Sequence, residues 1–184
     1  MFNWYIHHLI RIECLWLQLG GKRIGIVRLG SIGSEVSKRL LPFGCSIAYN
    51  SKKKKASVPF PYYPNISDFA VNSDVLIACC ALSDETYHII NWDVIMALGK
   101  EGVLINVRCE ALVDEMELLQ FLTRGEFGGA GLDVFENELD VPKELFLLDN
   151  VVLSPHCAVA TCDPKMLWCI GGADNLQFIG FLFK

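Results

Sequence analysis

Short apolar runs alternate with helical patterns along most of the chain. The runs are expected to form strands at Arg23–Val27, Ser46–Tyr49, Val75–Cys79, Val103–Asn106, Gly129–Leu132 and Val151–Leu153. Between them, patterns typical of helices occupy Glu35–Leu41, Ser67–Val71, Asn91–Leu98 and Asp114–Thr123. Strands that alternate with helices favour a parallel sheet covered on both faces. The pattern therefore predicts an α/β fold, a doubly wound parallel sheet in a single domain.

The stretch Gly21–Gly33 combines a strand, a glycine turn and the start of a helix, which is the opening unit of a Rossmann-like fold. Gly30 and Gly33 fill the last two places of the G-x-G-x-x-G motif, whereas Arg28 occupies the first. A helix N-terminus binds a pyrophosphate through its unpaired N–H groups. An ordinary strand–turn–helix remains the alternative. On the dinucleotide interpretation, the cofactor contacts Gly30, Ser31, Ile32 and Gly33.

Composition narrows the possible classes of protein. A length of 184 residues suits one domain, and a net charge of −5 gives no case for nucleic-acid binding. Hydrophobic residues make up 52%, and the mean hydropathy is +0.35, yet no apolar run reaches the roughly 18 residues of a membrane span. This composition indicates either a buried sheet or apolar surface that a partner covers.

The eight cysteines show neither disulfide-framework nor zinc-site spacing. We therefore expect no metal, and thiols kept reduced in the cytoplasm. Residues 1–20 are apolar but are interrupted by charged residues and histidines, and they lack the cleavage site of a signal peptide. We interpret them as a poorly specified leader.

Four further stretches resemble one family when taken in order and spacing. They are VLIACCALSDET (Val75–Thr86), INVRCEALVD (Ile105–Asp114), GGAGLDVFENE (Gly128–Glu138) and NVVLSPHCA (Asn150–Ala158). Together they resemble the D-isomer-specific 2-hydroxyacid dehydrogenases, in particular the hydroxyphenylpyruvate and hydroxypyruvate/glyoxylate reductases. The resemblance implies an NAD(P)-binding domain at residues 21–161, followed at 162–184 by the remnant of a C-terminal helix. It also implies that Cys80, Ala81 and Asp133 contact the cofactor.

The end of the second strand bears on the choice of cofactor. An acid at this point normally accepts a hydrogen bond from the ribose 2′-hydroxyl and so selects NAD. This chain instead has Asn50, Ser51, Lys52 and Lys53. A hydroxyl and cations suit a 2′-phosphate, so we expect NADP rather than NAD. A solvated lysine loop or a basic targeting patch is the alternative.

Arg28 has two opposite interpretations. Its charge could partly replace an arginine that this branch of the family often carries at the position of Ser31. Its side chain could equally block the phosphate turn. If the position requires a positive φ, a non-glycine residue there costs on the order of 1 kcal/mol.

The resemblance also implies a catalytic set. His156 matches the acid that protonates the developing alkoxide, and Glu138 matches the carboxylate that orients it. The family arginine that holds the substrate carboxylate is replaced by Cys109, with Arg108 one residue early and Glu110 adding negative charge. A cysteine cannot form the bidentate contact that an arginine makes to a carboxylate.

Two hypotheses follow. The first is the NADP-binding domain of an enzyme that uses NADPH to reduce hydroxyphenylpyruvate, hydroxypyruvate or glyoxylate to the 2-hydroxy acid, with impaired catalysis in this chain. The second is a non-catalytic fragment that binds a nucleotide or forms a homodimer through the coenzyme domain. The family's substrate domain is built mostly from preceding residues, so we expect negligible turnover by the chain alone. A small 2-keto acid is the expected partner, with neither a membrane nor nucleic acid involved.

Overall fold

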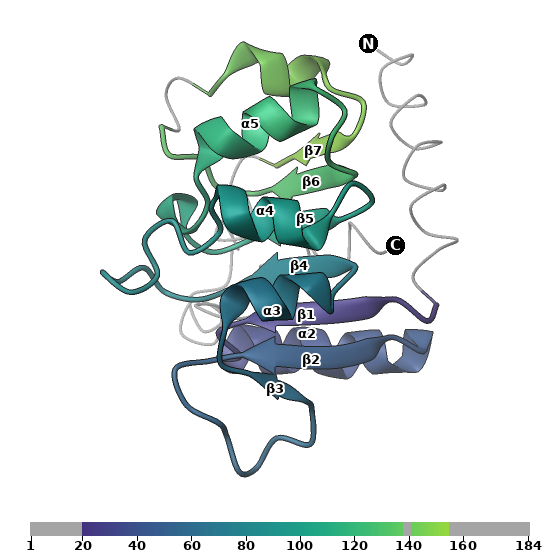
Figure 1. Cartoon of the computed structure of the whole chain (residues 1–184). Helices are drawn as coiled ribbons and strands as arrows, with labels where there is room; N and C mark the ends of the chain where they lie inside the picture. Colours follow the sequence, from purple (N-terminus) through teal and green to yellow (C-terminus); the bar gives the residue numbers. More distant parts are fainter. Residues whose placement is uncertain (1–19, 138–140, 155–184) are drawn as a thin grey trace, which may run out of the picture.

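Seven parallel strands form the centre of the molecule, which is known from a computed structural model that describes residues 20–137 and 141–154 (Figure 1). The strands are β1 (Arg23–Val27), β2 (Ser46–Asn50), β3 (Tyr62–Tyr63), β4 (Val75–Ala78), β5 (Val103–Asn106), β6 (Gly129–Leu132) and β7 (Val151–Leu153). Their spatial order is β3-β2-β1-β4-β5-β6-β7. The expected Rossmann-like parallel sheet is confirmed, including parallel pairing of the first two strands.

Helices cover both faces of the sheet. Helix α2 (Ser31–Leu40) lies behind β1 and β2 in Figure 1, whereas α3 (Ile66–Val71), α4 (Trp92–Leu98) and α5 (Glu115–Thr123) lie in front. Three 3-10 turns complete the described elements: η1 (Leu41–Phe43), η2 (Glu110–Leu112) and η3 (Lys143–Leu147). Both faces of the central strands are therefore buried, which explains why their sequences are continuously apolar.

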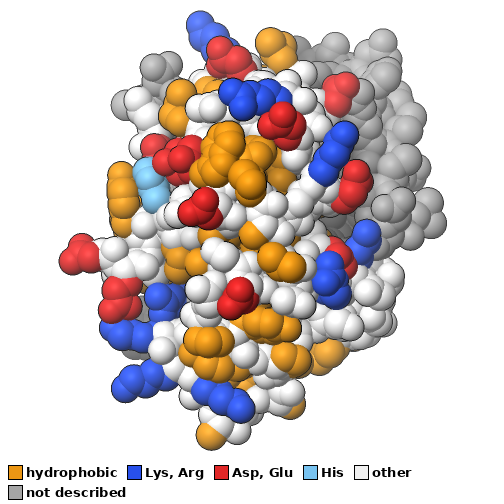
Figure 2. Space-filling view, viewed as in Figure 1, with side chains coloured by type: hydrophobic (Ala, Val, Ile, Leu, Met, Phe, Trp, Pro, Cys, Tyr) orange, Lys and Arg blue, Asp and Glu red, His pale blue; other side chains and the backbone are white. Residues whose placement is uncertain are grey.

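The side chains of β4 show how the two cores divide. Val75 and Ile77 pack with the α2 side, while Leu76 and Ala78 pack with the α3–α5 side. This alternation follows from the strand period of two residues. Val71 of α3, Met96 of α4 and Met116 of α5 are exposed. Figure 2 shows hydrophobic side chains interspersed with charged ones on this face.

Polar side chains begin three of the helices. The Asn65 side chain accepts hydrogen bonds from Ser67 N and Asp68 N at 2.8 and 3.0 Å, and Asp114 accepts one from Glu117 N at 3.0 Å. Asn91 caps α4 in the same way. Helix α3 therefore begins one residue before the expected Ser67, because Asn65 supplies the acceptor for its first N–H groups.

The loops at the carboxyl ends of the strands, here called the carboxyl edge, hold the regions of interest. β1 has β2 on one side and β4 on the other, and all three run parallel, so the order in which successive strands are added to the sheet reverses at β1. In such sheets ligands bind at this switch point, outside the carboxyl ends of the strands. The loops after β1, β2 and β4 meet there.

The limits of the described residues leave some expectations open. The proposed leader lies almost wholly outside them, and so do the segment 162–184 and the final part of the 21–161 domain. Among the described residues, no helix is both long and apolar enough to cross a bilayer, and no histidine, cysteine and carboxylate cluster could hold a metal ion.

Candidate nucleotide-binding site

The turn after β1 has a left-handed residue where the motif calls for glycine. Arg28 has a φ of +60°, and its backbone N donates to Asn50 O at 2.9 Å. Leu29 N donates to the same carbonyl at 3.3 Å. This position therefore does adopt a positive φ, and a non-glycine residue in that conformation costs on the order of 1 kcal/mol of stability. The turn thus keeps the glycine geometry without the glycine.

Gly30 and Gly33, the two glycines of the motif that the chain retains, have different roles. A Cβ on Gly33 would lie 2.6 Å from Ile26 Cγ2, so this glycine allows α2 to pack closely on β1. A Cβ on Gly30 would meet nothing closer than Arg28 O at 3.8 Å. Gly30 therefore leaves open space before α2, where a phosphate can approach the backbone. Next to it, Ser31 is exposed and Ile32 is buried in the core.

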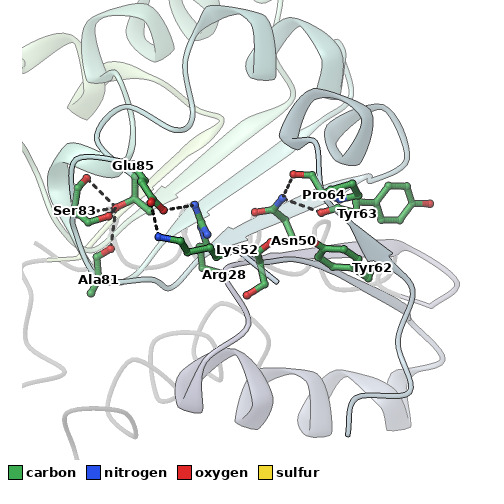
Figure 3. A network of polar contacts seen from close by, with 11 residues as sticks. Arg28, Asn50, Lys52, Tyr62, Tyr63, Pro64, Ala81, Ser83 and Glu85 are labelled. Carbon is green, nitrogen blue, oxygen red and sulfur yellow. Dashed lines mark hydrogen bonds and ion pairs between the residues drawn. The ribbon is translucent and has the colours of Figure 1, made fainter. Parts of the chain in front are cut away.

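Asn50, which stands at the end of β2, is turned towards the edge strand. Its Nδ2 donates to Tyr63 O at 2.9 Å and to Pro64 O at 3.2 Å (Figure 3). The residue is 4% exposed. Its amide thus stabilises the β2–β3 connection, a structural role that the sequence pattern did not indicate.

The lysine loop after β2 lies against the glycine turn. Lys52 Nζ is 2.5 Å from Glu85 Oε1, and Lys55 Nζ donates to Leu29 O. Ser51 O accepts a hydrogen bond from Tyr62 Oη at 3.2 Å, while Lys53 is exposed. The basic side chains therefore lie at the switch point, beside α2, rather than on a distant surface.

Glu85 connects the lysine loop with the glycine turn. It follows β4, and its Oε2 lies 3.7 Å from Arg28 Nη2 (Figure 3). The Lys52 ammonium, hydrogen-bonded to Glu85, holds the pKa of that carboxyl below its usual range. The motifs of the sequence did not indicate a role for Glu85. Its place in the sequence could have indicated it, because Glu85 lies in the loop after the third predicted strand. In a parallel sheet that loop lies at the same edge as the loops after the first two strands.

The other predicted cofactor residues follow β4 and β6. Cys80 is 7% exposed, and burial raises the pKa of its thiol to about 11. Ala81 is exposed, and its carbonyl accepts a hydrogen bond from Thr86 Oγ1 at 3.0 Å. Asp133 is completely buried directly after β6, and its N donates to Asn106 O at 3.0 Å. A neutral, buried thiol at Cys80 is a packing group rather than a nucleophile.

The catalytic positions are only partly visible. His156 and Glu138 lie outside the described residues. Cys109 is half-buried and precedes η2, and its carbonyl accepts a hydrogen bond from Asn106 Nδ2 at 2.9 Å. The structure therefore brings together the glycine turn, the lysine loop and Glu85, and of the expected catalytic set it describes Cys109 alone.

A second polar group on the carboxyl edge was also missed. His88 has a φ of +45° and stacks on Tyr87 with ring centroids 4.0 Å apart. Its Nε2 lies 2.5 Å from Glu136 Oε1, and its Nδ1 lies 3.3 Å from Asp114 Oδ2. These contacts tie the loop after β4 to the loop after β6 and to the start of α5.

Comparison with known proteins identifies the family. The profile described as D-isomer specific 2-hydroxyacid dehydrogenase, NAD binding domain, matches residues 4–158. The chain is 60% identical over 144 residues to glyoxylate/hydroxypyruvate reductase HPR3 of Arabidopsis thaliana, covering 78% of this chain and 45% of the relative. It is 48% identical over 163 residues to hydroxyphenylpyruvate reductase of Plectranthus scutellarioides, which covers 89% of this chain and 52% of the relative.

A solved structure agrees with this relationship. It is the NADPH-dependent glyoxylate/hydroxypyruvate reductase of Sinorhizobium meliloti in complex with NADP and malonate, which superposes with a TM-score of 0.76 at 38% identity. The alignment covers 86% of this chain and 48% of that one. The chain spans about half the length of the relatives it matches. Sequence motifs, sheet order and relatives agree, so the chain belongs to the D-isomer specific 2-hydroxyacid dehydrogenase family and corresponds to its NAD-binding domain.

Proposed function

We propose that this domain binds NADP(H) in preference to NAD(H), and that the protein it represents uses NADPH to reduce a small 2-keto acid. The observation that carries the proposal is the end of β2. The amide of Asn50 is engaged with Tyr63 and Pro64, and Ser51, Lys52 and Lys53 follow in place of a carboxylate. A hydroxyl and two ammonium groups favour a phosphate over a ribose hydroxyl.

The residues present fit a dinucleotide in other respects. Gly30 leaves open space before α2, and no side chain caps that helix in the described part of the chain. The first-turn N–H groups of α2 thus suit a pyrophosphate. NADPH, when bound, supplies a hydride for the carbonyl carbon of the keto acid. We assign Asp133 to positioning the nicotinamide end, with Cys80 and Ala81 beside the nucleotide.

For the chemistry, we assign His156 as the proton donor to the developing alkoxide and Glu138 as the carboxylate that orients it. Hydroxypyruvate, glyoxylate and hydroxyphenylpyruvate are the proposed substrates, by analogy with the names of the relatives. Cys109 takes the place of the substrate-binding arginine, so we expect a catalytically impaired chain. The described cysteines are free thiols, which suits a reducing compartment such as the cytoplasm.

A second candidate is a non-catalytic domain that binds the nucleotide or pairs with a second copy. The sequence Arg108-Cys109-Glu110 favours it, because a thiol and an added carboxylate cannot hold a keto-acid carboxylate. NADPH binding without turnover fits both candidates, whereas a dimer in light scattering from a chain that does not bind NADPH would support this candidate over the first.

Cofactor choice is tested by fluorescence titration with NADPH and NADH. Wild type should bind NADPH more tightly, and the Lys52→Ala, Lys53→Ala double variant should narrow the preference by about tenfold, since each lost cation weakens a charge-assisted contact. Lys54→Ala, in the same exposed loop, is the matched control and should leave the preference unchanged. Equal binding of NADH and NADPH by wild type would contradict the assignment.

Turnover is tested by NADPH oxidation with the three keto acids. Wild type should show negligible rates. The triple variant Arg108→Gly, Cys109→Arg, Glu110→Gly restores the charged donor, a contribution of about 10² to 10³ in rate. We expect little rescue, because orientation between two domains supplies roughly 7–11 kcal/mol of such a barrier. Clear turnover by wild type would overturn the proposed impairment.

A further inference from the structure

The carboxylate of Glu85 reaches across the switch point of the sheet. Glu85 follows β4, whereas its two cationic partners come from the other side, Arg28 after β1 and Lys52 after β2. Figure 3 shows the three side chains converging, with the Glu85 carboxylate in contact with both cations. One carboxylate thus contacts cations from the loops after β1 and β2, where the proposed dinucleotide binds.

The two cations are arranged as an anion site. Glu85 Oε1 contacts Lys52 Nζ at 2.5 Å, and Oε2 lies 3.7 Å from Arg28 Nη2. Arg28 is only 20% exposed in its side chain, and its buried Nε finds no hydrogen-bond acceptor among the described residues. A buried guanidinium donor without an acceptor favours an additional anion. A carboxylate and a phosphate oxygen satisfy such donors in the same way.

Other charged side chains lie in the same loops, including Lys55, whose Nζ donates to Leu29 O. Lys53 and Lys54 in the same loop are exposed, and Asp84 beside Glu85 is exposed. Basic side chains gather at the carboxyl edge, low on the left of the view in Figure 2, with acidic ones beside them. Among these acids, Glu85 is the one that contacts both Arg28 and Lys52.

We infer that Glu85 is an internal competitor of the nucleotide's phosphate groups. It occupies Arg28 and Lys52 in the free chain and must release them when a dinucleotide binds. Lys52 follows β2, on the side proposed for the 2′-phosphate, so Glu85 weakens the binding of NADPH more than the binding of NADH. This inference rests on the proposed cofactor site, and it makes Glu85 a determinant of cofactor selectivity rather than a ligand of the nucleotide.

The structure explains why the effect is graded and sensitive to salt. Glu85 and Lys52 are 52% and 68% exposed in their side chains. Ion pairs this open to water are weak and are screened by salt, so a phosphate can displace the carboxylate. The competition should therefore amount to a few-fold change in affinity and should diminish at high ionic strength.

The test compares wild type, Glu85→Gln and the matched control Asp84→Asn, which removes the same charge one residue away. Affinities for NADPH, NADH and inorganic pyrophosphate are measured by titration at low and high salt. Glu85→Gln should raise the affinity for NADPH by about threefold and the affinity for NADH by less. The affinity for pyrophosphate should rise measurably. Asp84→Asn should change none of them beyond about 1.5-fold. Thermal melting checks that all three chains are equally folded.

The outcomes separate this inference from the proposed function. NADPH binding that is equal in wild type and Glu85→Gln, or weaker in the variant, overturns the inference while leaving the cofactor assignment intact. An equal gain from Asp84→Asn also overturns it, since general charge would then explain the effect. If no chain binds NADPH, the proposed function fails, and the pyrophosphate titration alone decides whether Glu85 competes.

Discussion

The two edges of the sheet differ in how their polar groups are satisfied. At the amino edge, where β1 and β4 begin, Arg23 N donates to Asp74 Oδ2 at 2.7 Å, and the guanidinium donates to Oδ1 at 3.1 and 2.7 Å. At the carboxyl edge, Arg28 has a left-handed backbone, and its guanidinium stands 3.7 Å from Glu85. The Arg23 guanidinium is held by short hydrogen bonds, whereas Arg28 combines a positive φ with a longer ion-pair distance.

This difference indicates which edge is structural and which is reserved for a ligand. Strained residues and incompletely paired cations persist where the surrounding fold holds them, and they gather at binding sites. The tight contacts of the amino edge supply that support. The substitutions below test this contrast between the two edges.

The largest effect on stability is expected from Gly129→Ala at the amino edge. Its Cβ would lie 2.7 Å from Asn150 O, a backbone atom beside β7 that cannot give way easily. We expect the free energy of unfolding to fall by roughly 1–3 kcal/mol in urea denaturation, as for other overpacked sites. Gly30→Ala at the carboxyl edge is the matched control and should stay within about 0.5 kcal/mol. Equal losses at both glycines would contradict the contrast.

A smaller effect is expected from Asp74→Asn. The change removes the charge that Arg23 pairs with, and the free energy of unfolding at pH 7 should fall by about 1 kcal/mol, since solvent screens this half-exposed pair. The hydrogen bond from Arg23 holds the pKa of the Asp74 carboxyl below its usual 3.8. A lowered carboxyl pKa stabilises the fold above that pH, and the contribution disappears as the pH falls through the folded pKa.

The measurement is urea denaturation of both chains between pH 7 and pH 3. The difference between wild type and Asp74→Asn should be constant above about pH 5 and should shrink below pH 3.8. A difference that grows on acidification would show that the pair does not stabilise the fold in this way.

The smallest effect on stability is expected from Arg28→Gly, with the opposite sign. Glycine adopts the positive φ without strain, so unfolding should cost up to about 1 kcal/mol more, offset in part by the freedom of glycine in the unfolded chain. NADPH titration then chooses between the two interpretations of Arg28. Tighter binding means that the side chain obstructs the phosphate turn, and weaker binding means that its charge assists.

Most strands of the sheet could be predicted from the sequence because each depends on a local pattern of apolar residues. Buried parallel strands are continuous apolar runs, and six of the seven were expected within a residue of their ends. The strand that escaped prediction, Tyr62–Tyr63, has two residues and lies in a proline- and aromatic-rich stretch without alternation. Among the described strands it pairs with β2 alone, at the edge of the sheet, so its own sequence carries little signal.

The sequence by itself determined the family, the parallel sheet and the place of the glycine turn, since each depends on residues close together in the chain. Only the tertiary structure decided which charges meet. Lys52 and Glu85 are 33 positions apart, and their contact depends on β2 and β4 both flanking β1. Asn50, which stays a predicted cofactor contact, donates its amide to β3 and to the residue after it. Such pairings follow from strand order and register, which bring distant loops together and which no local pattern of apolar and polar residues encodes.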